Sequence, residues 1–177
     1  MAFEYRHLSL LSYSVTTAQR RSERQEWNPD LGVLASRLLF SLQDELFERL
    51  AEAGYGDLHP RHGAVLAYLD EDGIRATELA RLSGRHKQII GRIVDELEEL
   101  GYVERRPDPA DRRAKLIFPT QRGLNQVRLG DQIVADIEAR HSRGVGGRTY
   151  TQFRDVLRGV VARRTQFKEV TTPGAER

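Results

Sequence analysis

Basic side chains that could bind phosphate gather at two places in this 177-residue sequence. The stretch from Arg81 to Arg92 contains four basic residues and no acidic one, whereas the residues from Asp95 to Glu99 are mostly acidic. A second basic group lies a short way downstream, at Arg112 and Arg113. Guanidinium and ammonium groups at a helix start and a loop tip are suited to contacting the phosphates and base edges of DNA.

The overall charge does not by itself support that interpretation. The chain has 28 basic and 26 acidic residues, a formal net charge of +2, and the two signs are equal in number between Asp57 and Gly123. Charged clusters on helices are in most cases solvated surface, which is the alternative for each cluster taken alone. The order of the elements that hold the two clusters must therefore decide between these interpretations.

The elements predicted around the first cluster form a helix-turn-helix. A short helix is expected around Thr77–Leu82, a turn at Ser83 and Gly84, and a longer helix from Arg85 or His86 to Leu100. On the longer helix one face is apolar and the opposite face is polar, the latter formed by Gln88, Gly91, Arg92 and Asp95. Ile89 lies at the flank, where it either packs or contacts a thymine methyl group, and packing is favoured.

The second cluster lies at the tip of a predicted hairpin. Short β runs at 102–106 and 114–118 flank a segment rich in Pro and Asp, and Thr120 can cap the helix that follows. A helix-turn-helix followed directly by a basic-tipped hairpin is suited to duplex DNA, with the helix in the major groove and the hairpin arginine in the minor groove. The ordered combination favours DNA binding over two unrelated solvated faces.

Longer helices are predicted on both sides of this lobe. They cover residues 29–53, 60–69, 121–141 and 150–167, with Asp30 as a cap and a break at Gly144–Gly147. The predicted fold class is mainly α, of the α+β type: a winged helix-turn-helix with a two-stranded wing and with further N- and C-terminal helices. Apolar stripes too large for the winged lobe to cover indicate a homodimer, with an intramolecular bundle as the alternative; they comprise Ile133, Val134, Ile137, Phe153, Val156, Leu157, Val160 and Val161.

Several classes of function are excluded or disfavoured. The chain has no cysteine, which rules out disulfides and thiol-based sensing. No nucleophile elbow, P-loop, dinucleotide fingerprint or zinc-protease motif occurs, and the five histidines are scattered, so we expect no catalytic residue, no cofactor and no metal site. No uncharged stretch is long enough to span a bilayer, so a cytoplasmic protein without a membrane partner is expected.

The helix-turn-helix and hairpin segments resemble the MarR family of bacterial transcriptional regulators. The resemblance rests on Glu78-Leu79-Ala80, on the run from Val94 to Arg106, on the wing segment Asp108–Arg113, and on Thr120 with Gly123. It covers about Leu31 to Arg164. His86 departs from the usual Ser or Thr cap, and Gly91 from a small hydroxyl residue, so base preferences cannot be taken over from relatives.

The resemblance implies a regulator, expected to be a repressor, that binds a pseudo-palindromic DNA operator as a homodimer. The implied organisation is an N-terminal arm at 1–29, a dimerisation helix at 30–56, a DNA-binding lobe at 57–122, C-terminal dimerisation helices at 123–168 and a tail at 169–177. Arg113 matches the wing arginine, steadied by a local ion pair with Asp111. The full set of expected DNA contacts is Arg85, His86, Lys87, Gln88, Arg92, Arg105, Arg106, Asp111, Arg112 and Arg113.

Many members of that family release DNA when a small ligand binds between the two lobes. By position, the expected effector site comprises Tyr55, His59, Arg61, His62 and Tyr68, which would suit a small aromatic or anionic molecule. The alternative for His59 and His62 is a surface or capping role. The alternative for the whole chain is a winged-helix module that binds another protein, such as an antirepressor or an assembly factor, for which a basic wing tip would be unnecessary.

Overall fold

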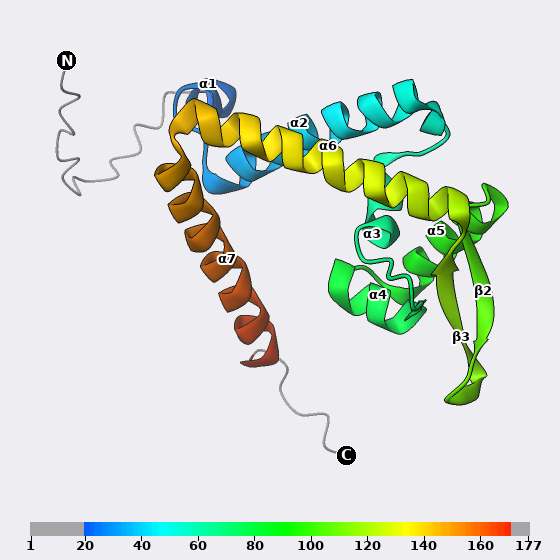
Figure 1. The fold of residues 1–177 in the computed structure, drawn as a ribbon. Coiled ribbons are helices and arrows are strands. Elements are labelled where there is room, and N and C mark those ends of the chain that lie inside the picture. The colour runs from blue at the N-terminus through cyan, green and yellow to red at the C-terminus, as the bar shows by residue number, and fades with distance from the viewer. Residues whose placement is uncertain (1–19, 171–177) are drawn as a thin grey trace. The chain divides into compact units, whose positions relative to one another are not determined.

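The protein is mainly helical, with one small antiparallel sheet (Figure 1). The computed structural model describes residues 20–170, apart from the side chains of Arg112 and of residues 164–170. The chain divides into two compact units, with the boundary after Phe40. The predicted arm at 1–29 and tail at 169–177 therefore lie largely outside the described residues.

The first unit contains α1 (Arg21–Trp27) and the start of α2 (Leu31–Leu50). Asp30 begins α2 as predicted, because its Oδ1 accepts a hydrogen bond from the Val33 N–H at 3.1 Å. The same carboxylate also accepts a hydrogen bond from the Gln25 side chain at 2.6 Å. α1 shows that part of the predicted arm is helical. Among the described residues of this unit, most large apolar side chains are exposed, namely Trp27, Leu31, Leu34, Leu38, Leu39 and Phe40.

The second unit begins within α2 and leads into the winged lobe. α2 ends in a π-helical turn, η1 (Ala51–Tyr55), where Gly54 has a φ of +94°. A 3-10 turn, η2 (Pro60–His62), and the single α turn α3 (Gly63–Leu66) follow. The helix predicted for 60–69 is therefore shorter, since the chain must turn at Asp70–Gly73 to enter the sheet.

The winged lobe is built from the predicted helix-turn-helix and hairpin. α4 (Ala76–Ser83) and α5 (Lys87–Glu99) are separated by a turn at Gly84, whose φ of +65° favours a residue without a Cβ atom. β2 (Val103–Asp108) and β3 (Asp111–Pro119) form the wing. A third strand, β1 (Ile74–Arg75), pairs with β3, giving the order β1-β3-β2. Two residues are too few to show strand alternation, so the sequence did not reveal β1.

One continuous core holds these elements together. α5 contributes its apolar face, and every other element of the lobe contributes at least one buried side chain. The core residues are Leu58, Val65, Leu66, Leu69, Ile74, Leu79, Ile90, Ile93, Val94, Leu97, Tyr102, Val103 and Ile117. The orientation of α5 is therefore fixed by burial on one side, which leaves its polar side outward.

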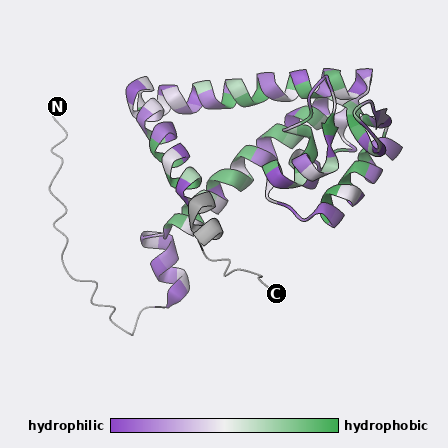
Figure 2. Cartoon of the chain, turned by 90° about the horizontal axis from the view of Figure 1, so that it is seen from below, coloured by the Kyte–Doolittle hydropathy of each residue, from purple (hydrophilic) through white to green (hydrophobic). Residues whose placement is uncertain are grey.

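The two C-terminal helices follow the wing. α6 (Gln121–Val145) begins at Thr120, whose hydroxyl accepts a hydrogen bond from the Gly123 N–H at 3.1 Å, and α7 (Gly147–Val170) follows a break at Gly146. Apolar and polar residues alternate along the long helices (Figure 2). Contrary to the prediction that Ile133 and Ile137 need a partner chain, both are buried against Leu50 of α2. The other members of the predicted stripe are exposed, namely Val134 of α6 and Phe153, Val156, Leu157, Val160 and Val161 of α7.

Candidate nucleic-acid interface

The first half of α5 exposes the polar residues that the sequence predicted to face DNA. Lys87, Gln88 and Arg92 are exposed, while Ile90 and Ile93 are buried beneath them. His86 begins the helix without a side-chain capping hydrogen bond, in agreement with its departure from a Ser or Thr cap. The positive end of the helix dipole therefore adds to the basic side chains around it. Ile89 is 42% exposed, so its side chain is partly covered at the flank of the helix and partly open to solvent.

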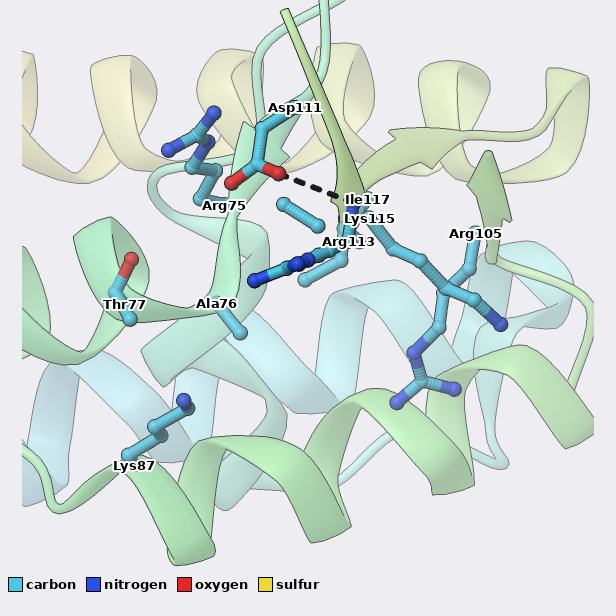
Figure 3. Close-up of a pocket in the computed structure, with 10 residues that line it drawn as sticks. Arg75, Ala76, Thr77, Lys87, Arg105, Asp111, Arg113, Lys115 and Ile117 are labelled. Carbon is cyan, nitrogen blue, oxygen red and sulfur yellow. Dashed lines mark hydrogen bonds between the residues drawn. The ribbon is translucent and has the colours of Figure 1, made fainter. Parts of the chain in front are cut away.

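A basic cavity of about 410 Å³ lies where α4, α5 and the wing meet (Figure 3). Its charged lining comes from β1, α5 and the two wing strands and contains a single acid, Asp111. The lining residues are Arg75, Ala76, Thr77, Lys87, Arg105, Asp111, Arg113, Ala114, Lys115 and Ile117. Figure 3 shows the Arg113 side chain extending toward the cavity between β3 and the start of α5. The fold thus joins the two basic clusters of the sequence into one surface.

The basic residues of the lobe fall into two groups according to their ion pairs. Arg105 is bound by Asp95, with 2.5 Å between Nη2 and Oδ1, and by Glu98, so that its side chain is only 23% exposed. Arg106 pairs with Glu104 and lies 4.7 Å above the Phe118 ring. By contrast, some cations form no ion pair with any acid in the described part of the chain; they are Arg85, Lys87, Arg92, Arg113 and Lys115.

This division separates predicted DNA contacts that are free to bind a phosphate from those that are already bound to an acid. An exposed arginine without an acidic partner can neutralise a phosphate without first losing an interaction. Arg106 pairs with an exposed glutamate, and because exposed ion pairs contribute little free energy, Arg106 could exchange this partner for a phosphate at low cost. Arg105 would have to leave two carboxylates, and these pairs tie β2 to the C-terminal half of α5. Its position is therefore that of a structural link at the base of the wing.

At the wing tip, Asp111 contacts Arg113 in a way that the sequence did not predict. The Arg113 backbone N–H donates to Asp111 Oδ1 at 3.0 Å (Figure 3). The aspartate steadies the main chain at Arg113 and leaves the guanidinium exposed, in place of the expected ion pair. Arg112 was also predicted to contact DNA, and its side chain lies outside the described residues.

The predicted effector residues differ in their contacts and exposure. The Tyr55 ring is half-buried and lies 6.2 Å from the Tyr102 ring, whereas Tyr68 is exposed. Arg61 and His62 instead meet Glu96 of α5: Arg61 Nε donates to Glu96 Oε2 at 2.8 Å, and His62 Nε2 lies 3.0 Å from the same oxygen. These two residues therefore connect η2 to α5.

His62 also has the capping role that was its alternative interpretation. It is 1% exposed, and its Nδ1 accepts a hydrogen bond from the backbone N–H of the exposed His59 at 3.1 Å. Because Nδ1 accepts a hydrogen bond, the neutral ring carries its proton on Nε2, and this N–H donates a hydrogen bond to Glu96. Burial lowers the pKa of His62 below its ordinary value, although Glu96 opposes that shift.

Sequence reasoning missed Arg75, Thr77 and Lys115 as parts of the interface. Arg75 lies in the two-residue strand β1, and Lys115 lies in the second wing strand with no sequence signal that separates it from ordinary surface lysines. Within residues 20–170, no group of three or more histidines and acids is placed to hold a metal ion. None of the helices in that range combines the length and apolar character that a membrane span requires.

Comparisons with known proteins agree with this geometry. The MarR family sequence model matches residues 56–114. CouR from Rhodococcus jostii RHA1, solved bound to p-coumaroyl-CoA, is 31% identical with a TM-score of 0.62, over 74% of this chain and 91% of CouR. A MarR family transcriptional regulator from Rhodococcus sp. RHA1 is 29% identical with a TM-score of 0.61, over 81% of this chain and 96% of its own.

A further structure shows the transcriptional repressor CouR bound to a 23-mer DNA duplex; it is 25% identical with a TM-score of 0.61, over 80% of this chain and 96% of its own. No curated protein matches the chain. The winged lobe, the helices on both sides of it and the similarity to CouR agree with one another. The chain belongs to the MarR family, whose members are DNA-binding transcriptional regulators and not enzymes.

Proposed function

We propose that the protein is a repressor that binds a pseudo-palindromic operator as a homodimer. The observation that supports this most directly is a set of four exposed cations that form no ion pair within the described residues. Arg85 precedes α5, Lys87 and Arg92 lie on α5, and Arg113 lies on the wing, with Lys87 and Arg113 lining the same cavity. α5 would lie in the major groove, with Gln88 suited to adenine and Arg92 to guanine. Arg113 would reach the minor groove.

The dimer would be formed by residues 30–56 and 123–168, with one winged lobe, residues 57–122, from each copy. Support comes from the apolar side chains of α7 that remain exposed in a single chain, such as Phe153, Val156 and Val160. A two-fold dimer places its two recognition helices about 34–36 Å apart, which corresponds to one turn of DNA. The operator should accordingly contain two inverted half-sites with that spacing.

The test is a titration of the DNA upstream of the protein's own gene, at several salt concentrations. Arg92→Ala should lose about 1–3 kcal/mol at one base position, whereas Lys87→Ala should weaken binding to all sequences and reduce the salt slope by about 1. Arg21→Ala, which removes an exposed arginine from α1, outside the proposed DNA-binding and dimerisation elements, is the matched control. Equal affinity for operator and random DNA would refute the proposal.

We further propose that an aromatic, anionic molecule releases the protein from DNA. The support is that CouR, a relative 31% identical, was solved bound to p-coumaroyl-CoA, which is both aromatic and anionic. Adding p-coumaroyl-CoA, p-coumarate or coenzyme A to the preformed complex separates the contributions of the ring and the phosphates. Release by the thioester alone would mean that both are required, and no release by any of the three would contradict this effector class.

A further inference from the structure

The wing tip contains a carboxylate that is buried although its neighbours are exposed. Asp108, the last residue of β2, has a side chain only 6% exposed, whereas Pro107, Pro109 and Asp111 are exposed. The strand register shifts between Pro107 and Asp108, which turns Asp108 out of the regular alternation. A buried charge needs a partner, so the contacts of Asp108 show what the tip is attached to.

Both oxygens of this carboxylate are used. Oδ1 accepts a hydrogen bond from the Ala110 N–H at 2.8 Å, which closes the turn of the hairpin. Oδ2 is bound by the Arg75 guanidinium, at 2.7 Å from Nε and 2.5 Å from Nη2. The Ala110 N–H and then Arg75 hold the pKa of Asp108 below its usual value, so the carboxylate is ionised at neutral pH.

The Arg75 contact joins two elements that are distant in sequence. Arg75 ends β1 and immediately precedes α4, the first helix of the helix-turn-helix. Because the strand order is β1-β3-β2, its side chain must reach across β3 to meet Asp108. The wing tip is thereby attached to the helix-turn-helix by an ion pair, while Arg105 attaches the base of the wing to α5.

The attachment extends to the DNA-contacting arginine of the wing. Asp108 is the register partner of Asp111, and Asp111 Oδ1 accepts the backbone N–H of Arg113. A two-stranded hairpin is marginally stable by itself, so its tip would sample several directions without an anchor. Anchoring at Asp108 restricts the directions from which Arg113 can approach a groove.

We propose that Arg75 is a positioning residue which, through Asp108, orients the wing so that Arg113 and α5 can contact DNA at the same time. This inference rests on the proposed function, because it assigns a cause to the wing's share of operator binding. Arg75 is also 44% exposed and lines the basic cavity. A direct contact between Arg75 and a phosphate is therefore the competing explanation that the test has to separate.

The test compares operator binding by wild type, Arg75→Gln, Asp108→Asn, Arg113→Ala and the double variant Arg75→Gln/Arg113→Ala. Asn at position 108 keeps an oxygen that can accept the Ala110 N–H, so the turn is retained while the charge is lost. Glu71→Gln, which breaks the exposed pair with Arg128, is the matched control. Circular dichroism and thermal unfolding of each variant establish that it is folded at the assay temperature.

If Arg75 acts through the wing, Arg75→Gln and Asp108→Asn should each weaken operator binding about tenfold, close to the loss in Arg113→Ala. The double variant should bind within about twofold of Arg113→Ala, because an unanchored wing that lacks its arginine has nothing further to lose. Hydroxyl-radical protection in the minor groove should disappear, while guanine protection in the major groove under α5 should remain. Arg75→Lys should restore part of the affinity.

Additive losses in the double variant, with a salt slope lower by about 1 than that of Arg113→Ala, would overturn the positioning role and indicate a direct phosphate contact. Unchanged binding by Asp108→Asn in a folded protein would overturn it as well. If wild type does not distinguish the operator from random DNA, the proposed function fails. If wild type and Arg113→Ala behave as expected while Arg75→Gln does not, only the positioning inference fails.

Discussion

The winged lobe and helix α7 differ in how far their apolar residues are buried. In the lobe, side chains from every element meet in one core, and Ile90, Val94 and Leu97 of α5 are buried there. In α7, by contrast, the apolar residues Phe153, Val156, Leu157, Val160 and Val161 are all exposed. The lobe therefore obtains its shape from its own residues, whereas α7 has an apolar surface that a single copy does not cover.

The largest effect is expected from charges placed on the exposed apolar face of α7. Val156→Asp together with Val160→Asp should prevent the proposed dimer, because burying two carboxylates in an apolar interface is costly. We expect a monomer by analytical ultracentrifugation and a loss of operator affinity of at least about 100-fold, since the second half-site no longer contributes.

Gln152→Asp adds a carboxylate at an exposed polar position of the same helix and should leave the dimer intact. In both variants the thermal transition of the winged lobe should persist, because its core contains no α7 residue. A double variant that remains dimeric would show that the α7 stripe is not the interface.

A second test compares two adjacent isoleucines of α5. Ile90 is fully buried in the core of the lobe, whereas Ile89 is 42% exposed. Ile90→Ala should lower the free energy of unfolding by about 2–5 kcal/mol, measured by urea denaturation, because it leaves a cavity. Ile89→Ala should change stability by less than about 0.5 kcal/mol and act, if at all, on DNA binding. Equal losses from the two variants would mean that the lobe core is not closed as described.

The smallest expected effect concerns the pH dependence of the lobe through His62. Burial lowers the pKa of His62 in the folded protein, while the unfolded chain takes up the proton near the ordinary value of about 6.5. Below that pH the unfolded state binds more protons, so the stability that neutral His62 provides is complete above about pH 7.5 and declines as the pH falls.

Between pH 7.5 and 5.5 the Tm of wild type should fall by on the order of 2 °C more than that of His62→Gln. His59→Gln, at an exposed neighbouring position, is the matched control and should keep the wild-type dependence. The same fall in Tm for His62→Gln and wild type would place the titrating group elsewhere.

Much of the fold could be predicted from the sequence, because local signals mark most of its elements. The apolar period of α5, the Pro and Asp residues at the wing tip and the caps at Asp30 and Thr120 all act within a few residues of each other. β1 escaped prediction because two residues show no period. Ile133 and Ile137 were misassigned because an apolar stripe does not reveal whether it packs on its own chain.

The candidate interface was predictable as a set of basic residues but not as a set of roles. From the sequence, both Arg92 and Arg105 were expected to contact DNA. In the structure, Arg105 forms ion pairs with Asp95 and Glu98 of α5 and thereby links the wing to that helix. Similarly, His62 was grouped with effector residues until its burial and its contact with Glu96 were known. Such distinctions depend on which acid approaches which base.

By itself, the sequence determined the order of elements, the family resemblance and the two basic clusters hidden within an almost neutral chain. Only the tertiary structure decided which cations remain unpaired, that Arg75 reaches across the sheet to the buried Asp108, and that α7 alone keeps an extended exposed apolar stripe among the C-terminal helices. The physical reason is that helix periods and caps arise between neighbours in sequence, whereas ion pairing and burial depend on residues that folding brings together from distant segments.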